Sequence, residues 1–246
     1  MKYVFDEVSN ILGEPTMFGN FEIPQPKVKN INSFYYGLQC LQIRKNRSEN
    51  IEILKMTYLE FLLREIEKEK NEDNSKKFLT SSLYHLMLSL FGEVDIAYII
   101  NGSSSEITIN DKKIKAIEFD DFKKLIFKQN YIQFDENLTQ EVEEGVKKVE
   151  EYQSKQQNYK SPTFAEMIVS YHVATLTPYK DVKELTIGQF QMGLERFNLL
   201  KDFEVYTYAQ LKSGKKDIKH WMSHIDREIN YSKYFTKTSK TINKIQ

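Results

Sequence analysis

Four histidines carry the most versatile side chains of this sequence, and two of them have a spacing that suits a metal. His220 and His224 are four residues apart, so a helix would place both imidazoles on one face, with Glu228 following on it. Zinc accepts such ligands, but the segment lacks the glutamate that acts as general base in His-Glu-x-x-His. We therefore predict no metal site and interpret both histidines as flanking a packed Trp221.

Other catalytic patterns are also missing from the sequence. Cys40 is the only cysteine, which excludes an intramolecular disulfide, and its aromatic surroundings favour a small buried hydrophobe over a nucleophile. The glycines are not spaced as in a dinucleotide-binding or phosphate-binding loop. The adjacent carboxylates of Asp120 and Asp121 fit a helix cap better than an acid/base pair. We expect a protein that is not an enzyme and uses no cofactor.

Charge is balanced over the whole chain but unevenly distributed along it. The 35 Lys and Arg equal the 35 Asp and Glu, which makes nucleic acid an unlikely partner. Residues 135–151 hold seven acids and two lysines, a net −5, whereas residues 212–246 hold nine basic and three acidic residues, a net +6. Two solvated faces are the simpler interpretation, and self-association or a charged partner is the alternative.

The sequence shows neither a secretion signal nor a membrane segment. The first ten residues lack an apolar core, and no stretch approaches the roughly 18 apolar residues of a membrane span. We expect no membrane partner and a location in the cytoplasm.

Hydrophobic periodicity predicts a mainly α (α+β) fold: a helical bundle with a small antiparallel β-meander near residues 94–118. Helices are expected over 49–70 and 75–91, then from Asp120 or Asp121, and again from Asn137 as N-cap. Thr163 with Glu166, and Thr186 with Gln189, form two capping boxes that begin further helices. Further helices are expected over 204–212 and 217–229.

The expected helices group into lobes. Residues 1–30 hold three of the five prolines and are interpreted as an arm that packs on a partner or crosses its own domain. A helical lobe with the meander follows over 31–152. The stretch 153–162 is the most linker-like, and a C-terminal helical lobe (163–231) and a basic tail (232–246) complete the chain.

Aromatic residues are the candidates for partner binding. Core packing accounts for most of them, and any that stay exposed would mark a partner surface. The candidate partner-binding residues are Phe122, Phe190, Phe197, His220 and Trp221.

Three segments in this order resemble tail assembly proteins, including the tail assembly chaperones, of tailed phages that infect low-GC Gram-positive bacteria. They are Asp121-Phe122 leading to Gln129-Asn130, Leu185 to Phe190 followed by Glu195-Arg196, and Ala209 to Gly214 followed by Lys219-His220-Trp221. The resemblance covers roughly Phe119 to Ile225.

The resemblance implies a non-enzymatic assembly factor in the host cytoplasm. As a chaperone, it would bind the tape-measure or tail-tube protein, or itself, through apolar helix stripes until polymerisation. One alternative is a structural virion component of the neck, tail or baseplate. A second is a regulatory or nucleic-acid-binding protein that uses the basic C-terminal segment.

Overall fold

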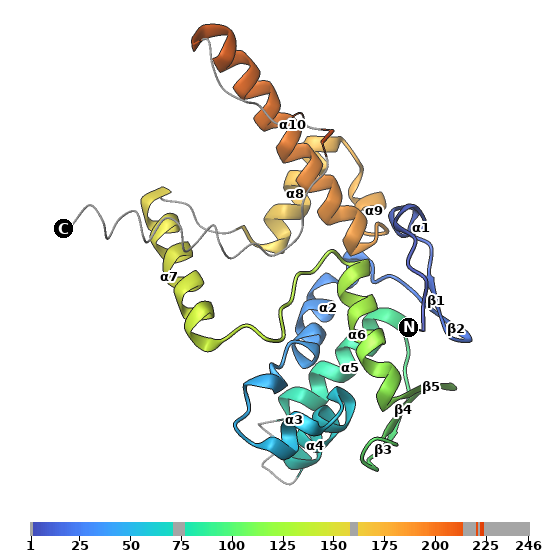
Figure 1. Cartoon of the computed structure of the whole chain (residues 1–246). Helices are drawn as coiled ribbons and strands as arrows, with labels where there is room; N and C mark the ends of the chain where they lie inside the picture. Colours follow the sequence, from blue (N-terminus) through green and yellow to red (C-terminus); the bar gives the residue numbers. More distant parts are fainter. Residues whose placement is uncertain (1, 71–76, 158–161, 214–219, 221, 224–246) are drawn as a thin grey trace, which may run out of the picture.

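The computed structural model describes residues 2–70, 77–157, 162–213, 220 and 222–223, and it is mainly helical with two small antiparallel sheets (Figure 1). The predicted fold class is therefore confirmed. The basic tail lies outside the described residues, as does most of the helix expected over 217–229. No helix within the described ranges is both long enough and apolar enough to cross a bilayer.

Ten α-helices, three short 3-10 helices and five strands make up the described part of the chain. In chain order they are α1 (Glu7–Leu12), β1 (Thr16–Phe18), β2 (Phe21–Ile23), η1 (Val28–Asn30), α2 (Ile31–Leu38), η2 (Gln39–Leu41), η3 (Lys45–Arg47), α3 (Ile51–Lys55), α4 (Tyr58–Lys70), α5 (Phe78–Phe91), β3 (Ile96–Ile99), β4 (Glu106–Ile109), β5 (Lys112–Lys115), α6 (Ala116–Gln129), α7 (Gln140–Gln157), α8 (Phe164–Thr175), α9 (Tyr179–Val182) and α10 (Ile187–Ser213).

We call helices α2 to α6, together with the arm and the meander, the body of the protein. Its hydrophobic core forms where α2 and α5 cross at close distance. A Cβ atom added to Gly37 of α2 would lie 2.3 Å from the backbone nitrogen of Leu86 in α5. Only a glycine, which has no Cβ atom, allows two helix backbones to approach this closely. The crossing lets the apolar faces of α4 and α6 pack around it, with Phe34, Leu62 and Phe119 fully buried.

The predicted meander is present and packs against the helices. Its strands have the order β3-β4-β5, with Ile107 paired to Tyr98 on one side and to Ile114 on the other. Ile107, Ile109 and Ile114 are completely buried, while alternate positions reach the surface. This alternation is what a sheet with one covered face requires.

Residues 1–30 cross their own domain. The hairpin β1–β2, which the sequence did not reveal, places Phe18 at 6.0 Å from the Phe122 ring of α6. Tyr3, Ile23 and Val28 are buried as well. Of the two interpretations of this arm, packing against its own molecule is the one that the structure supports.

Two helix starts were predicted wrongly. The helix expected from Asp120 or Asp121 begins at Ala116, and Asp121 accepts a hydrogen bond from the backbone nitrogen of Lys2 instead of capping. The helix expected from Asn137 begins at Gln140. Thr139 accepts from the backbone nitrogen of Val142 at its start. At the observed start of α6 the Glu118 carboxylate accepts from the Lys115 backbone nitrogen, and in α7 the Thr139 hydroxyl takes the capping role predicted for Asn137.

The helix expected over 49–70 is broken into α3 and α4. Met56 is extended (ψ 150°), Thr57 caps α4 by accepting from the backbone nitrogen of Glu60, and the Lys45 ammonium donates to the Leu54 carbonyl at the end of α3. Ile51 is consequently exposed and not part of a continuous apolar face. The reverse occurs near the C-terminus, where the helices expected to begin near Thr186 and over 204–212 form the single helix α10.

The acidic helix α7 extends from the body and is fixed near its first turn (Figure 1). The Glu143 carboxylate lies 2.6 Å from Arg47 and 2.9 Å from Arg44, and the Arg47 guanidinium also donates to the Leu138 carbonyl. These partners, Arg47 first, lower the pKa of Glu143 to about 2. The position of α7 therefore depends on an ion pair more than on apolar packing.

We predict that Gly37→Ala lowers the free energy of unfolding by roughly 1–3 kcal/mol, because the new Cβ would press on the backbone of α5. Urea denaturation of the purified protein measures this change. Gly145→Ala in α7 is the matched control. Nothing lies within 4 Å of its Cβ position, so it should raise stability by about 0.5–1 kcal/mol. Equal effects of the two substitutions would contradict the close crossing.

We predict that Glu143→Gln lowers stability at neutral pH by about 0.5–1 kcal/mol, the range of a partly solvated ion pair. Because the pKa of Glu143 falls from 4.5 to about 2 on folding, its contribution is complete above pH 4.5 and is lost between pH 4.5 and 2. Urea denaturation at several pH values should show the two proteins converging over this interval. Glu144→Gln is the matched control: the Glu144 carboxylate accepts from Gln140 of the same helix, so its loss should lower stability at neutral pH less than Glu143→Gln does.

Candidate protein-binding surface

The capping box that begins α8 is formed as the sequence predicts. The Thr163 backbone nitrogen donates to the Glu166 carboxylate at 2.7 Å, and the Glu166 backbone nitrogen donates to the Thr163 hydroxyl at 3.3 Å. The Thr163 hydroxyl also donates to the Glu166 carboxylate, at 2.9 Å, and the two hydrogen bonds from the Thr163 backbone nitrogen and hydroxyl lower the pKa of Glu166. The box fixes where α8 begins, and with it which side chains point inward.

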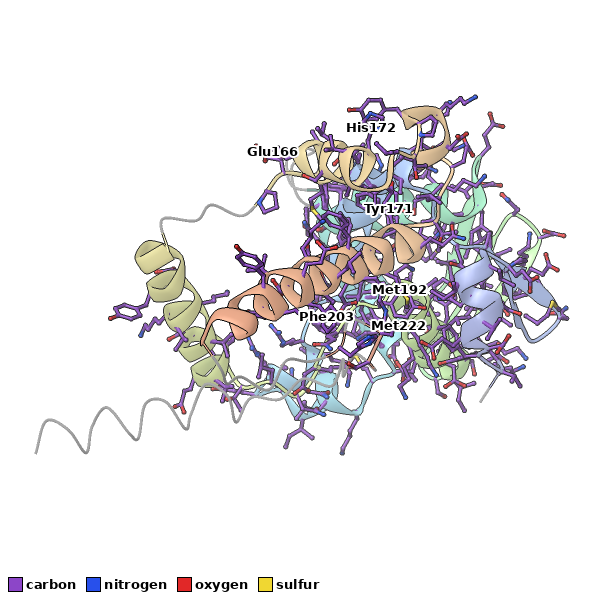
Figure 2. All side chains as sticks on the ribbon, turned by 90° about the horizontal axis from the view of Figure 1, so that it is seen from above. Glu166, Tyr171, His172, Met192, Phe203 and Met222 are labelled. Carbon is purple, nitrogen blue, oxygen red and sulfur yellow. The ribbon has the colours of Figure 1, made fainter. Side chains whose placement is uncertain are left out.

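The inner face of α8 packs on α2 and α10. Phe164 stacks on Tyr35 of α2, with ring centroids 4.8 Å apart, and Tyr171 lies 5.2 Å from Phe190 of α10. A Cβ at Gly193 would lie 2.6 Å from the Tyr171 ring, so this glycine allows the ring to lie directly on the α10 backbone. Figure 2 shows Tyr171 between α8 and α10.

The outer face of α8 is apolar too, although it faces solvent. Ala165 is exposed, and Val169 and Val173 follow at four-residue spacing with 48% and 67% of their surface accessible. Leu176, just after the helix, is 81% accessible. Four-residue spacing aligns these side chains on one side of the helix. We call Ala165, Val169, Val173 and Leu176 the α8 stripe.

The backbone at Leu176 is unusual for a leucine. The residue caps α8 in the left-handed conformation, with φ at +57°, where glycine or asparagine is the common choice. Leucine therefore adds backbone strain here, and its side chain is mostly in solvent. Fold stability does not explain this residue, whereas a contact made by its side chain with another molecule would.

Helix α10 continues the exposed apolar surface outward. Its 27 residues span about 40 Å at 1.5 Å per residue, and Figure 1 shows its distal half extending beyond α8. Val205, Tyr206 and Tyr208 on this half are 64%, 45% and 63% accessible. Helices α8 and α10 thus both carry exposed apolar side chains, which extend over more than one helical turn.

At the end of the α8 stripe, His172 is held by a short polar contact and by a stacked ring. His172 Nδ1 lies 2.8 Å from the Thr177 carbonyl, and its ring stacks on Tyr179 at 4.2 Å. These contacts fix the corner between α8 and α9. They position the surface and leave the histidine without a nucleophile to activate.

Two of the predicted partner-binding residues are core residues. Phe122 and Phe190 are completely buried, the first against Phe18 and Phe119 and the second against Tyr171. Their assignment to a partner surface is corrected, because no partner can reach a side chain that its own fold encloses. Core packing, the other interpretation of these aromatics, applies to both.

The other three candidates lie further along the C-terminal region. Phe197 is half-buried in α10, with the Lys201 ammonium 5.6 Å from the centre of its ring. His220 is exposed, and its ring centroid lies 5.0 Å from that of Phe203. Trp221 and His224 lie outside the described residues.

The described residues contain no group of three or more histidine, cysteine or carboxylate side chains that could hold a metal ion. Cys40 is buried, as predicted, and burial raises the pKa of its thiol. Lys123 is also buried, with its ammonium 3.5 Å from the centre of the Tyr58 ring and 3.2 Å from Glu136. Burial lowers the pKa of Lys123, and these contacts give it a structural role.

A hollow of about 500 Å³ lies between the arm and the meander, lined by residues that include Glu22, Lys27, Phe91 and Lys112. Lys27 is bound to Glu184 at 2.8 Å. The lining mixes opposite charges and contains no nucleophile paired with a base, so the α8 stripe is the stronger candidate for function.

Sequence reasoning missed the α8 stripe for an identifiable reason. Residues 164–176 are apolar on both sides of the helix, so periodicity cannot tell which side faces the core. The polar residues of α8 (Glu166, Ser170, His172 and Thr175) are spread around the helix and do not gather into one polar face, so the pattern does not identify a single buried side.

Comparison with known proteins associates this region with a phage-related family. The family model described as the YomV second domain matches residues 153–226. The matched range begins in the last turns of α7 and contains α8, α9 and α10. No curated protein and no solved structure matches the chain.

We predict that Val169→Ser with Val173→Ser changes the free energy of unfolding by less than about 0.5 kcal/mol, because both side chains are already in solvent. Ile168→Ser, on the packed inner face of the same helix, should cost roughly 2–4 kcal/mol. Urea denaturation of the three proteins measures the contrast. A large loss in the double variant would show that the stripe is covered within the free chain.

Proposed function

We propose that the chain is a non-enzymatic phage tail assembly factor that binds an apolar helical partner through the α8 stripe. The observation that carries this proposal is a solvent-facing row of aliphatic side chains on a helix whose other face is packed. It lies within the region matched by a phage-related family model, and the resemblance to tail assembly proteins includes the same helices.

The chemistry of the stripe favours a helix as its ligand. Aliphatic side chains at four-residue spacing interdigitate with the ridges of a second helix, and Ala165 allows that helix to approach closely at one end. Such a contact removes apolar surface from water and does not require the partner to supply matching hydrogen-bond donors or acceptors. A tape-measure protein, long and helical with apolar stripes, is the partner proposed, with the tail-tube protein as a further candidate.

A structural virion component is the second function considered, and the fold of residues 1–30 weakens the case for it. The proline-rich arm that would lock such a protein to its neighbours is built into its own fold through Phe18, Ile23 and Val28. Phe18, Ile23 and Val28 are therefore not available to lock the chain to its neighbours in a virion. The proposed chaperone acts in the host cytoplasm, whereas a structural component would remain in the virion.

Co-expression with tape-measure fragments from the same phage tests the proposal. We expect the wild-type chain to co-purify with them and Val173→Asp to weaken binding by roughly a hundredfold or more, since a charge replaces a buried apolar contact. Ser104→Asp adds the same charge to an exposed position in the loop between β3 and β4, at the end of the molecule away from α8 (Figure 1), and it should bind as wild type does.

Mass spectrometry of purified particles separates the two assembly roles. Absence of the chain from mature virions, together with stripe-dependent binding, supports the chaperone. Its stoichiometric presence would contradict a chaperone and indicate a structural component. Equal binding by the Val173→Asp and Ser104→Asp variants would contradict the role of the α8 stripe.

A further inference from the structure

The two edges of the three-stranded sheet differ in charge. Strand β5 carries Lys112, Lys113 and Lys115 on one edge of the sheet, whereas β3 on the other edge reads Ile-Ala-Tyr-Ile and has no charged residue. Natural proteins use lysines and prolines to keep an edge strand from pairing with another chain. The β5 edge has such protection, and the β3 edge lacks it.

The hydrogen-bond pattern shows which backbone groups of β3 face outward. In an antiparallel pair, successive residues of a strand turn their N–H and C=O groups to opposite sides. The Asn110 backbone nitrogen donates to the Asp95 carbonyl at 2.8 Å, so the odd-numbered residues of β3 bond to β4. The backbone groups of Ile96, and of Ile100 just after the strand, consequently point away from β4. No strand of the described residues pairs with this outer side of β3.

The side chains of β3 alternate between the two faces of the sheet. Tyr98 is half-buried, and its hydroxyl donates to the Glu67 carboxylate of α4. Ala97 and Ile99 face solvent, and Ile99 is 62% accessible. A further strand added beside β3 would cover part of this apolar surface through cross-strand contacts.

We propose that β3 is a dimerisation edge, on which β3 of a second copy of the chain pairs antiparallel to give one continuous six-stranded sheet. The two-fold axis passes at Tyr98, so Ile96 of each copy exchanges hydrogen bonds with Ile100 of the other. On the solvent face, Ala97 of each copy then lies opposite Ile99 of the other. A small side chain meets a large one, and the Tyr98 contact with Glu67 on the opposite face is kept.

Charge identifies a second copy as the occupant of this edge. In the proposed pairing Asp95 lies opposite Asn101 of the other copy, so no like charges meet along the joined strands. Pairing through the β5 edges would instead bring lysines against lysines, which is unfavourable. A contact made by the same strand on both copies also closes after two chains and leaves the lysine-bearing edges outermost.

The register follows from the positions of the polar residues and the turn. Sliding the copies by two residues in one direction would place Ile99 opposite the charged Asp95. Sliding them in the other direction would place Ile96 opposite Gly102, where the chain turns with φ at +51°. Pairing about Tyr98 avoids both and uses the whole strand.

The dimer is independent of the proposed tail-assembly role. Figure 1 shows the meander at the end of the body opposite α8 and α10, so the α8 stripe stays accessible in both copies. The contact is confined to one strand on each copy and belongs with small, transient interfaces. We therefore expect a reversible dimer, and Val173→Asp should dimerise as the wild type does.

Disulfide trapping tests the register. Ala97 and Ile99 of the other copy would form a pair with Cα atoms about 4.5 Å apart, which a disulfide can span. Mixing the Ala97→Cys chain with the Ile99→Cys chain under mild oxidation should give a covalent dimer. Either chain alone should react at least roughly tenfold more slowly, because its cysteines would lie on a diagonal, about 7–8 Å apart. The native Cys40 is buried, and burial raises the pKa of its thiol, so it does not compete.

Lys113→Cys mixed with Lys115→Cys is the matched control for trapping, since both lysines are exposed on β5. This mixture should react no faster than its separate chains. Equal trapping by the β5 mixture and the β3 mixture would overturn the proposal, and so would trapping of the single β3 variants as fast as their mixture.

Sedimentation equilibrium measures the dimer of the full-length protein. Ala97→Lys combined with Ile99→Lys places lysine opposite lysine at both cross-strand pairs and should raise the dimer Kd at least roughly tenfold. Ser170→Lys combined with Asn198→Lys adds the same charge at exposed positions on α8 and α10, and it should leave the Kd unchanged. Circular dichroism confirms that each variant is folded. A wild-type chain that is monomeric up to about 0.5 mM, or equal Kd values for the two lysine variants, would contradict the β3 dimer.

Discussion

The joint between the arm and the C-terminal helices is the constraint on which the rest of the structure depends. The backbone of residues 26–29 pairs with residues 183–187: the Ile187 nitrogen donates to the Pro26 carbonyl, the Val28 nitrogen to Leu185 and the Lys29 nitrogen to Lys183. Lys27 and Lys29 both bind Glu184, which lowers the pKa of that carboxyl. A segment at one end of the chain thereby fixes the corner from which α10 begins.

Buried amides make this joint specific. Gln129, at the end of α6, donates to the Thr16 hydroxyl and the Ile23 carbonyl of the arm, and Asn10 donates to the Gln129 carbonyl. Gln189 in the first turn of α10 donates to the Ile11 carbonyl. Buried polar groups are costly unless they are hydrogen-bonded, so these pairings strongly disfavour other registers of the arm. The joint orients α8 and α10 relative to the body.

The orientation of these helices decides which apolar side chains meet the core and which meet solvent. Both helices have more apolar side chains than one contact face can bury. For α8 the surplus is the α8 stripe, which faces solvent, and for α10 it includes Val205, Tyr206 and Tyr208, which are exposed on its distal half. The surface proposed for function, the α8 stripe, thus consists of apolar side chains left over after the core is complete.

The sequence by itself determined the fold class, the meander and the two capping boxes, because these depend on periodicity, turn residues and spacing within a few positions. It also identified Cys40 as a buried hydrophobe from its neighbours. Only the tertiary structure decided the break at Met56, the hairpin in the arm, and the burial of Phe122 and Phe190 while Val173 stays exposed. The physical reason is that exposure depends on which surfaces meet across long separations in the chain. A helix that is apolar on both sides carries no local signal to choose between them.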